Sequence, residues 1–142
     1  MFWPERRCDI SEYHTVEMDF GDKKKIIQAL KEMKYNPRVY VEPRRLRGYK
    51  GDTRKQKAEI IVPKEQVGPV SNDIGFELKN GKYILHISEY DKSAKTFDYK
   101  KMTSIYNTSK LLAPLKKNPK YHISKKKIRK DGKIELEITL NF

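Results

Sequence analysis

Two alternating runs of apolar residues around an Asn80-Gly81 pair constrain the fold more than any other feature of the sequence. Both central residues of a tight two-residue hairpin turn need a positive φ, which Asn and Gly tolerate. An Asn-Gly pair between alternating runs is therefore the strongest short-range signal for a β-hairpin. The sequence predicts an antiparallel hairpin over 73–87 with one apolar face. The residues expected on that face are Ile74, Phe76, Leu78, Tyr83, Leu85 and Ile87.

Alternation with a period of two predicts five further strands along the chain. Their ranges are 15–20, 38–41, 58–62, 121–129 and 134–142. In the strand over 38–41 we expect Val39 and Val41 to face the core. We expect the final strand to lie within the main sheet, because Ile134 and every second residue after it are apolar.

Apolar residues at helical spacing predict two helices. Asp22 is expected to cap the first helix, which ends before Asn36-Pro37. The second helix begins near Asp98, and Pro114 is expected to end or kink it. The order β-α-β-β-β-β-α-β-β predicts an α+β fold, with a mainly antiparallel sheet of about six or seven strands and both helices on one face.

The length of 142 residues suits one domain, and 11% aromatic residues are too many for a disordered chain. We therefore expect a single domain over 1–142, with a basic loop over 42–57 and a basic C-terminal hairpin over 120–142. The single Cys8 excludes an internal disulfide and a thiolate-rich zinc site. The sequence begins without the apolar core of a signal peptide, and no apolar run approaches the roughly 20 residues that span a bilayer. These features predict the cytoplasm or an organelle interior, with no secretion and no membrane partner.

The formal net charge of +13 is concentrated in two segments. Seven cations and one acid lie in 44–57, and nine cations and one acid lie in 116–133. The two segments thus carry +6 and +8, which leaves the rest of the chain at −1. Clustered charge of one sign raises the local potential and attracts a polyanion such as nucleic acid.

Several motifs give the chain a family resemblance. The motifs are Leu46-Arg47-Gly48-Tyr49-Lys50-Gly51, Ala58-Glu59-Ile60-Ile61-Val62, Asp73-Ile74-Gly75-Phe76 and Asp131-Gly132-Lys133-Ile134. From about Ser11 onward the chain resembles an uncharacterised family, first catalogued as the hypothetical chloroplast reading frame thirty-five, which occurs in chloroplasts, cyanobacteria, other bacteria and phages. The resemblance implies a compact domain without a known cofactor, and it carries no established activity.

Enzymatic chemistry finds little support in the residue pattern. The three histidines, His14, His86 and His122, lack the spacing to one another or to carboxylates that a metal site needs. His86 is expected to face solvent or to contact a neighbouring strand. Glu77-Leu78-Lys79 with Asp73 upstream has the form of some metal-dependent nuclease sites. Glu77 and Lys79 also fit the polar face of an alternating strand, so we predict no enzyme, no metal and no cofactor.

Two features of the basic segments leave alternatives open. The glycines of Gly48-Tyr49-Lys50-Gly51 allow either an ordinary turn or a backbone nest that places the neighbouring arginines against phosphate. If Lys130 pairs with Lys133 in the C-terminal hairpin, three cations fall on its inner face, where burial without partners is costly. Either a bulge shifts the register and turns Ile128 inward, or the tip extends beyond the core. Both outcomes expose residues 125–127.

The sequence therefore predicts a small basic non-enzymatic protein that binds nucleic acid, with RNA favoured over DNA. It would be a ribonucleoprotein subunit or a phage-type accessory factor within a larger complex. The alternative is a protein-interaction adaptor that uses the hairpin over 73–87, and a metal-dependent nuclease comes third. The predicted nucleic-acid-binding residues are Arg44, Arg45, Arg47, Tyr49, Lys50, Arg54, Lys55, Lys57, Lys120, Tyr121, Lys125, Lys126, Lys127, Arg129 and Lys130.

Overall fold

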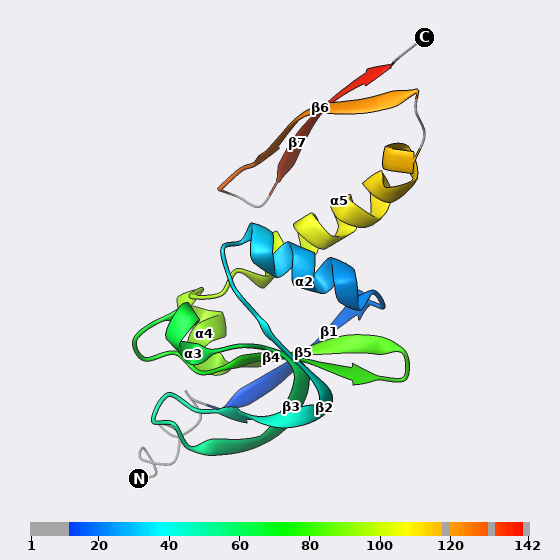
Figure 1. Ribbon diagram of the computed structural model, residues 1–142. Helices are drawn as coiled ribbons and strands as arrows, with labels where there is room; N and C mark the ends of the chain where they lie inside the picture. The colour runs from blue at the N-terminus through cyan, green and yellow to red at the C-terminus, as the bar shows by residue number, and fades with distance from the viewer. Residues whose placement is uncertain (1–11, 118–119, 131–132, 141–142) are drawn as a thin grey trace. The chain divides into compact units, whose positions relative to one another are not determined.

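The computed structural model describes residues 12–117, 120–130 and 133–140 (Figure 1). The chain divides into two compact units, one ending at Asp98 and the other beginning at Tyr99, and each is described by itself. The single domain expected over 1–142 stays a prediction. The elements are β1 (Tyr13–Phe20), α2 (Lys23–Glu32), β2 (Arg38–Arg47), β3 (Thr53–Val62), α3 (Lys64–Val67), β4 (Ile74–Lys79), β5 (Lys82–Ser88), α4 (Glu89–Ala94), α5 (Tyr99–Lys117), β6 (Tyr121–Ile128) and β7 (Ile134–Leu140).

The first unit contains a five-stranded antiparallel sheet in the order β1-β5-β4-β3-β2. The predicted α+β class and antiparallel pairing are confirmed, whereas the main sheet has five strands and not the six or seven expected. The strands are divided between two sheets, however, because β7 pairs with β6 in a separate two-stranded sheet. The expectation that the final strand lies in the main sheet was therefore wrong.

The β4–β5 hairpin forms as predicted. Asn80 has a φ of 52° and Gly81 a φ of 79°, as a tight turn between strands requires. The apolar residues predicted for one face of this hairpin are buried, with one exception. Leu78 is 43% exposed because it lies beyond Phe76, the last β4 residue that pairs with β3.

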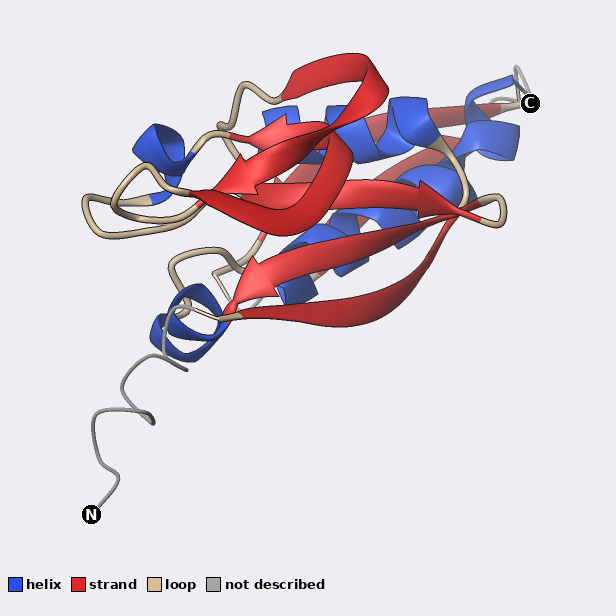
Figure 2. Ribbon diagram, turned by 90° about the horizontal axis from the view of Figure 1, so that it is seen from below, coloured by secondary structure: helices blue, strands red, loops and turns tan. Residues whose placement is uncertain are grey.

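Helix α2 lies on one side of the sheet (Figures 1 and 2). The Asp22 carboxylate accepts hydrogen bonds from two first-turn N–H groups, which confirms the predicted cap. The helix ends earlier than its periodicity suggests. Lys34 adopts a left-handed φ of 73°, and the N–H of Tyr35 donates to the carbonyl oxygen of Leu30 at 3.0 Å. This is a Schellman motif closed by a lysine instead of the usual glycine.

Two apolar clusters organise the first unit. In one, the rings of Phe76 and Phe97 meet edge to face with centroids 6.5 Å apart, and Tyr35 lies 5.5 Å from Phe97. The other cluster consists of Tyr13, Leu46, Ala58 and Ile61, with Tyr40 packed against it. Only glycine fits at Gly75 of β4, because a Cβ there would lie 2.7 Å from the Cβ of Ala58 and 2.8 Å from Leu46 Cδ2.

Most of the predicted basic loop is a hairpin, which corrects the range 42–57. β2 continues to Arg47 and β3 begins at Thr53, so the turn is confined to 48–52. The ribbon is strongly curved and irregular (Figures 1 and 2). From Val39 to Arg44 β2 advances five positions while β3 advances two, so β2 carries three extra residues. Val39 is 41% exposed and Val41 is 97% exposed. The prediction that both residues face the core was therefore wrong.

The remaining helices differ from the predicted pattern in detail. α3 and α4 are short helices in segments for which no helix was predicted. α5 begins where expected, and its apolar residues at helical spacing are buried, namely Met102, Ile105, Tyr106 and Leu112. Pro114 lies inside α5, which continues to Lys117, so the proline does not end this helix.

Candidate nucleic-acid interface

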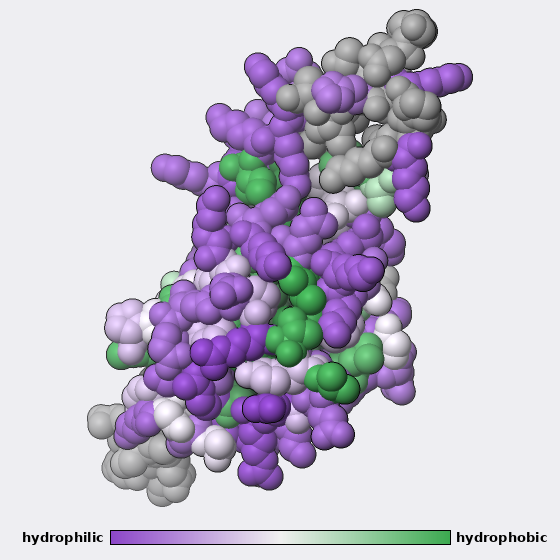
Figure 3. Space-filling model, viewed as in Figure 1, coloured by the Kyte–Doolittle hydropathy of each residue, from purple (hydrophilic) through white to green (hydrophobic). Residues whose placement is uncertain are grey.

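The β2–β3 ribbon (residues 38–62) presents a set of exposed cations. Arg45 lies directly opposite Lys57, and both side chains are exposed. Like charges placed opposite one another on an antiparallel pair are destabilising. Hydrophilic side chains also cover most of the face shown in Figure 3. The exposed predicted residues of the ribbon are Arg44, Arg45, Tyr49, Lys50, Lys55 and Lys57.

Three exposed cations lie close together along this ribbon. Lys55 lies two residues before Lys57, the partner of Arg45, in a stretch where the pairing of β2 with β3 shifts register again. Among the residues that the structure describes, none of the three forms an ion pair. The guanidinium of Arg44 instead lies 4.2 Å from the ring centroid of Tyr40. The ribbon therefore presents exposed cations without an ion pair in the described part of the chain, while Glu42 and Glu59 belong to the same two strands.

The turn at the ribbon tip is held by internal hydrogen bonds. The N–H of Gly48 donates to the carbonyl of Asp52 at 2.7 Å, and that of Gly51 donates to the carbonyl of Gly48 at 2.8 Å. The N–H of Tyr49 donates to Oδ1 of Asn72 at 2.8 Å. Three N–H groups of the segment already have acceptors, which favours the ordinary turn over a phosphate-binding nest. The Tyr49 side chain is 39% exposed, and Lys50 Nζ lies 5.5 Å from its ring centroid.

Arg47 and Arg54 were predicted to contact phosphate, and both make ion pairs within the protein. Arg47 Nη2 lies 2.8 Å from Oε1 of Glu65, and Arg47 Nε lies 3.2 Å from Oδ2 of Asp73. Hydrogen bonds to Glu65 and then Asp73 raise the pKa of Arg47, and the bond to Arg47 lowers the pKa of Glu65 to about 2. Arg54 Nε lies 2.7 Å from Oδ2 of Asp52. The guanidinium groups of both arginines are therefore occupied by carboxylates of the protein itself, and we assign them to stabilising the ribbon.

Asp73 links the ribbon to the start of β4. Its buried carboxylate accepts four hydrogen bonds, two at each oxygen. Oδ2 accepts from the Arg47 main-chain N–H at 2.7 Å and from Nε at 3.2 Å. Oδ1 accepts from the Lys64 N–H at 2.8 Å and from Arg47 Nη2 at 3.2 Å. The Tyr13 hydroxyl donates to the Asp73 carbonyl at 2.8 Å, and burial followed by the charge of Asp73 raises the Tyr13 pKa.

A second buried network adjoins Asp73 in the sequence. Asp91 is fully buried and accepts hydrogen bonds from the hydroxyls of Ser88 at 2.7 Å and Thr96 at 2.6 Å. It also accepts from the N–H of Asn72 at 3.0 Å. Oδ1 of Asn72 in turn accepts the hydrogen bond from the N–H of Tyr49. Because Asp91 belongs to α4, this chain of hydrogen bonds connects the ribbon tip to α4. No spacing pattern among these residues predicted the network.

The second basic segment has a different charge environment. β6 and β7 pair with a register shift between Ile123 and Lys125, and Ile128 lies opposite Ile134. Of the two alternatives left open for this hairpin, the structure thus has the shifted register, in which Lys130 is not the partner of Lys133. Residues 125–127 are exposed as predicted. Lys120, Arg129 and Lys130 are exposed as well, whereas the side chain of Tyr121 and the turn at 131–132 lie outside the described residues.

Glutamates of β7 lie opposite two of the cations on β6. Lys125 lies opposite Glu137, and Lys127 lies opposite Glu135. Arg129 Nη1 also lies 3.4 Å from Oε1 of Glu135. Opposite charges across a strand pair are favourable, unlike the Arg45–Lys57 pair of the ribbon. In both segments, therefore, some predicted site residues pair with or face acidic residues. They are Arg47 and Arg54 in the first segment and Lys125, Lys127 and Arg129 in the second.

The carboxylates of the suspected nuclease motif have separate partners. Asp73 binds Arg47 and the Lys64 N–H, whereas Glu77 Oε1 lies 2.8 Å from Nε2 of His86. His86 is 4% exposed and contacts neighbouring strands, so the cross-strand alternative is confirmed and the solvent-facing one was wrong. Across 12–117, 120–130 and 133–140, no group of three or more His, Cys, Asp or Glu residues could hold a metal ion.

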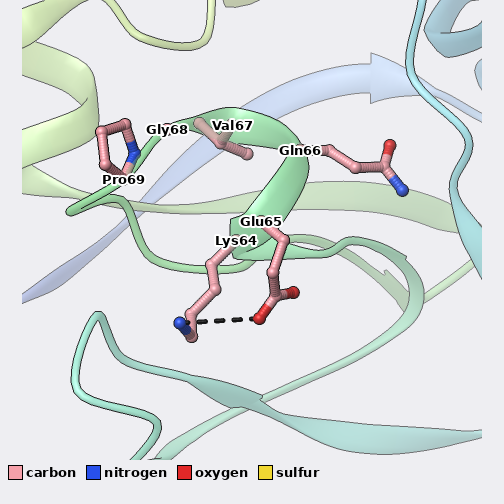
Figure 4. Close-up of a pocket in the computed structure, with 6 residues that line it drawn as sticks. All are labelled: Lys64, Glu65, Gln66, Val67, Gly68 and Pro69. Atoms are coloured by element: carbon pink, nitrogen blue, oxygen red, sulfur yellow. Dashed lines mark ion pairs between the residues drawn. The ribbon is translucent and has the colours of Figure 1, made fainter.

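A hollow of about 460 Å³ adjoins α3 (Figure 4). It is formed by one short stretch of chain, and Lys64 Nζ lies 3.5 Å from Oε2 of Glu65 at its edge. Glu65 is already paired with Arg47, so the charges around this hollow are balanced. The residues that line it are Lys64, Glu65, Gln66, Val67, Gly68 and Pro69.

The fold and site define a small basic α+β protein with an antiparallel sheet and a cationic β-ribbon. A family model described as "Protein of unknown function (DUF1257)" matches residues 29–137. The chain belongs to this family, which is consistent with the resemblance carried by its sequence motifs. Searches of curated proteins and of solved structures returned no match. Within the described residues, no helix is long and apolar enough to cross a membrane.

Proposed function

We propose that this protein binds nucleic acid through the β2–β3 ribbon. The observation that carries the proposal is the exposed Arg45–Lys57 pair, in which two cations face each other without an acidic partner. Such a pair costs folding free energy, and a bound phosphate would relieve the repulsion. Lys55, two residues before Lys57 in β3, is exposed as well and adds to the charge of the strand.

The tip of the ribbon supports a contact with unpaired bases. Tyr49 is partly exposed, its main chain is fixed by Asn72, and Lys50 lies beside its ring. Aromatic side chains next to cations stack on bases while the cations bind the backbone. We therefore favour single-stranded RNA over duplex DNA, although a two-stranded β-ribbon also fits the DNA major groove. The setting would be the cytoplasm or an organelle interior, within a ribonucleoprotein or as an accessory factor in phage-type biology.

Titrations of labelled single-stranded RNA, duplex RNA and duplex DNA over a range of salt concentrations test the proposal. If the five exposed cations among the predicted residues of the ribbon each bind a phosphate, log affinity for a single strand should fall against log salt with a slope of about −3 to −4. Arg45→Glu should weaken binding roughly tenfold and reduce the slope by about 1. It should not lower the melting temperature, because Glu opposite Lys57 forms a favourable pair.

Lys23→Glu provides the matched control, since it makes the same change in charge at an exposed helix position away from the ribbon. If the two variants weaken binding equally, net charge accounts for it and the ribbon has no special role. If the wild-type protein binds none of the three nucleic acids, the proposal fails. The adaptor alternative would then take the lead, since Leu78 is 43% exposed near the tip of the β4–β5 hairpin.

A further inference from the structure

Three polar side chains form a hydrogen-bonded row across neighbouring strands of the five-stranded sheet. Thr15 on β1 pairs with His86 on β5, and its Oγ1 lies 3.2 Å from His86 Nδ1. His86 Nε2 lies 2.8 Å from Oε1 of Glu77 on β4. The side chains of His86 and Glu77 are 5% and 19% exposed, whereas Thr15 is exposed at the surface.

The partners of His86 determine the direction of these hydrogen bonds. An ionised carboxylate has no proton to donate, so in the bond to Glu77 the proton belongs to Nε2. A neutral imidazole with its proton on Nε2 has a lone pair on Nδ1, which accepts the hydroxyl proton of Thr15. A hydroxyl bonded to an imidazole that a carboxylate orients is the arrangement that activates hydroxyl nucleophiles.

Thr15 is one of the residues that line a hollow of about 670 Å³. The charged residues of this lining are of both signs, and Lys79 Nζ lies 3.7 Å from Oε1 of Glu77. The lining residues are Thr15, Glu17, Met18, Lys79, Asn80, Lys82 and Ile84.

We infer that Thr15, His86 and Glu77 form a nucleophilic relay that hydrolyses carboxylic esters. Thr15 Oγ1 attacks the carbonyl carbon while its proton passes to His86 Nδ1. The bond to the leaving alkoxide then breaks, and the alkoxide takes that proton. Water attacks the acyl-threonine, and its proton passes through His86 to Thr15 Oγ1, which releases the acid. Glu77 is a positioning residue that holds the imidazole and balances its transient charge.

This inference is independent of nucleic-acid binding, because Thr15 lies on β1 and the ribbon ends in β2, the two opposite edges of the sheet. It departs from the expectation that the protein is not an enzyme. It also differs from the suspected nuclease, because it needs no metal and uses Glu77 through His86.

Labelling of the full chain with a fluorophosphonate tests the nucleophile directly. Thr15 Oγ1 would attack phosphorus, fluoride would leave, and the hydroxyl proton would pass to His86. Peptide mapping by mass spectrometry should place the label on Thr15. Thr15→Val should abolish labelling and Thr15→Ser should retain it. Thr53→Val, which changes another exposed strand threonine, should label like the wild type.

Hydrolysis of p-nitrophenyl acetate tests the relay in turnover. Glu77→Gln should lower kcat at least about tenfold with little change in KM, which a merely structural role would not produce. The variant should melt near the wild-type temperature, and His86→Gln provides a second test of the base. The inference is overturned if Thr15 stays unlabelled, or if it is labelled equally fast in folded Glu77→Gln and His86→Gln.

Discussion

Replacing Asp73 by Asn should destabilise the first unit more than its small change in shape suggests. Each carboxylate oxygen accepts two hydrogen bonds, and all four come from N–H donors of Arg47 and Lys64. Whichever way the amide of an Asn is turned, one oxygen becomes an NH₂ group that faces two donors. One main-chain N–H and one guanidinium N–H would then lose their acceptor.

The cost follows from the number of bonds lost. A hydrogen bond to a charged group contributes about 1.5–3 kcal/mol, so two lost bonds predict a destabilisation of about 3–6 kcal/mol. Water cannot readily replace the lost acceptor, because Asp73 is only 2% exposed. For a chain of 142 residues this corresponds to a fall in melting temperature of about 10–20 °C.

Thermal unfolding followed by circular dichroism, together with urea titration, measures this effect. Asp22→Asn is the matched control, because Asn caps a helix about as well as Asp and should change stability by only a few tenths of a kcal/mol. A loss of less than about 1 kcal/mol in Asp73→Asn would refute the reasoning. It would mean that the guanidinium of Arg47 is held mainly by Glu65.

Two further predictions concern the helix end and the acid limb of stability. Lys34→Gly should stabilise the protein by roughly 1 kcal/mol, because glycine adopts the φ of 73° without the steric cost of a side chain; urea titration would show it, and an unchanged or lower midpoint would contradict the Schellman assignment. The Glu65 pKa falls from 4.5 to about 2, so its contribution to stability is present above pH 4.5 and is lost as the pH falls toward 2. The free energy of unfolding should therefore decline less steeply over this pH range in Glu65→Gln than in the wild type. The difference should be modest, because the Glu65 side chain is 58% exposed. Parallel curves of unfolding free energy against pH would contradict the ion pair.

Local signals predicted the parts of the fold that depend on short-range chemistry. The β4–β5 hairpin follows from Asn80-Gly81, whose positive φ angles come from the residues themselves. The Asp22 cap is equally local. The ribbon was mistaken for a loop because Pro43 and two glycines usually interrupt strands. Pro43 is tolerated in β2 because β2 is an edge strand with an irregular register.

The candidate site was harder to predict, because charge counts do not show which partners the cations have. Arg47 belongs to the basic segment, yet its acidic partners Glu65 and Asp73 lie in other segments. Glu135 and Glu137 alternate along the last strand, and this pattern could have indicated compensation of β6. Its effect depended on the register, which the bulge after Ile123 shifts.

Both edges of the five-stranded sheet are poor templates for another chain. β1 shifts register between Glu17 and Phe20, and β2 carries three extra residues between Val39 and Arg44. A regular exposed edge would allow strands of separate molecules to pair and aggregate, which bulges and charges oppose. On β2 the cations that would attract a polyanion also repel a second copy of the chain. Neutralising them with a bound polyanion removes the electrostatic half of this protection, so the bulges alone must then prevent self-association through this edge.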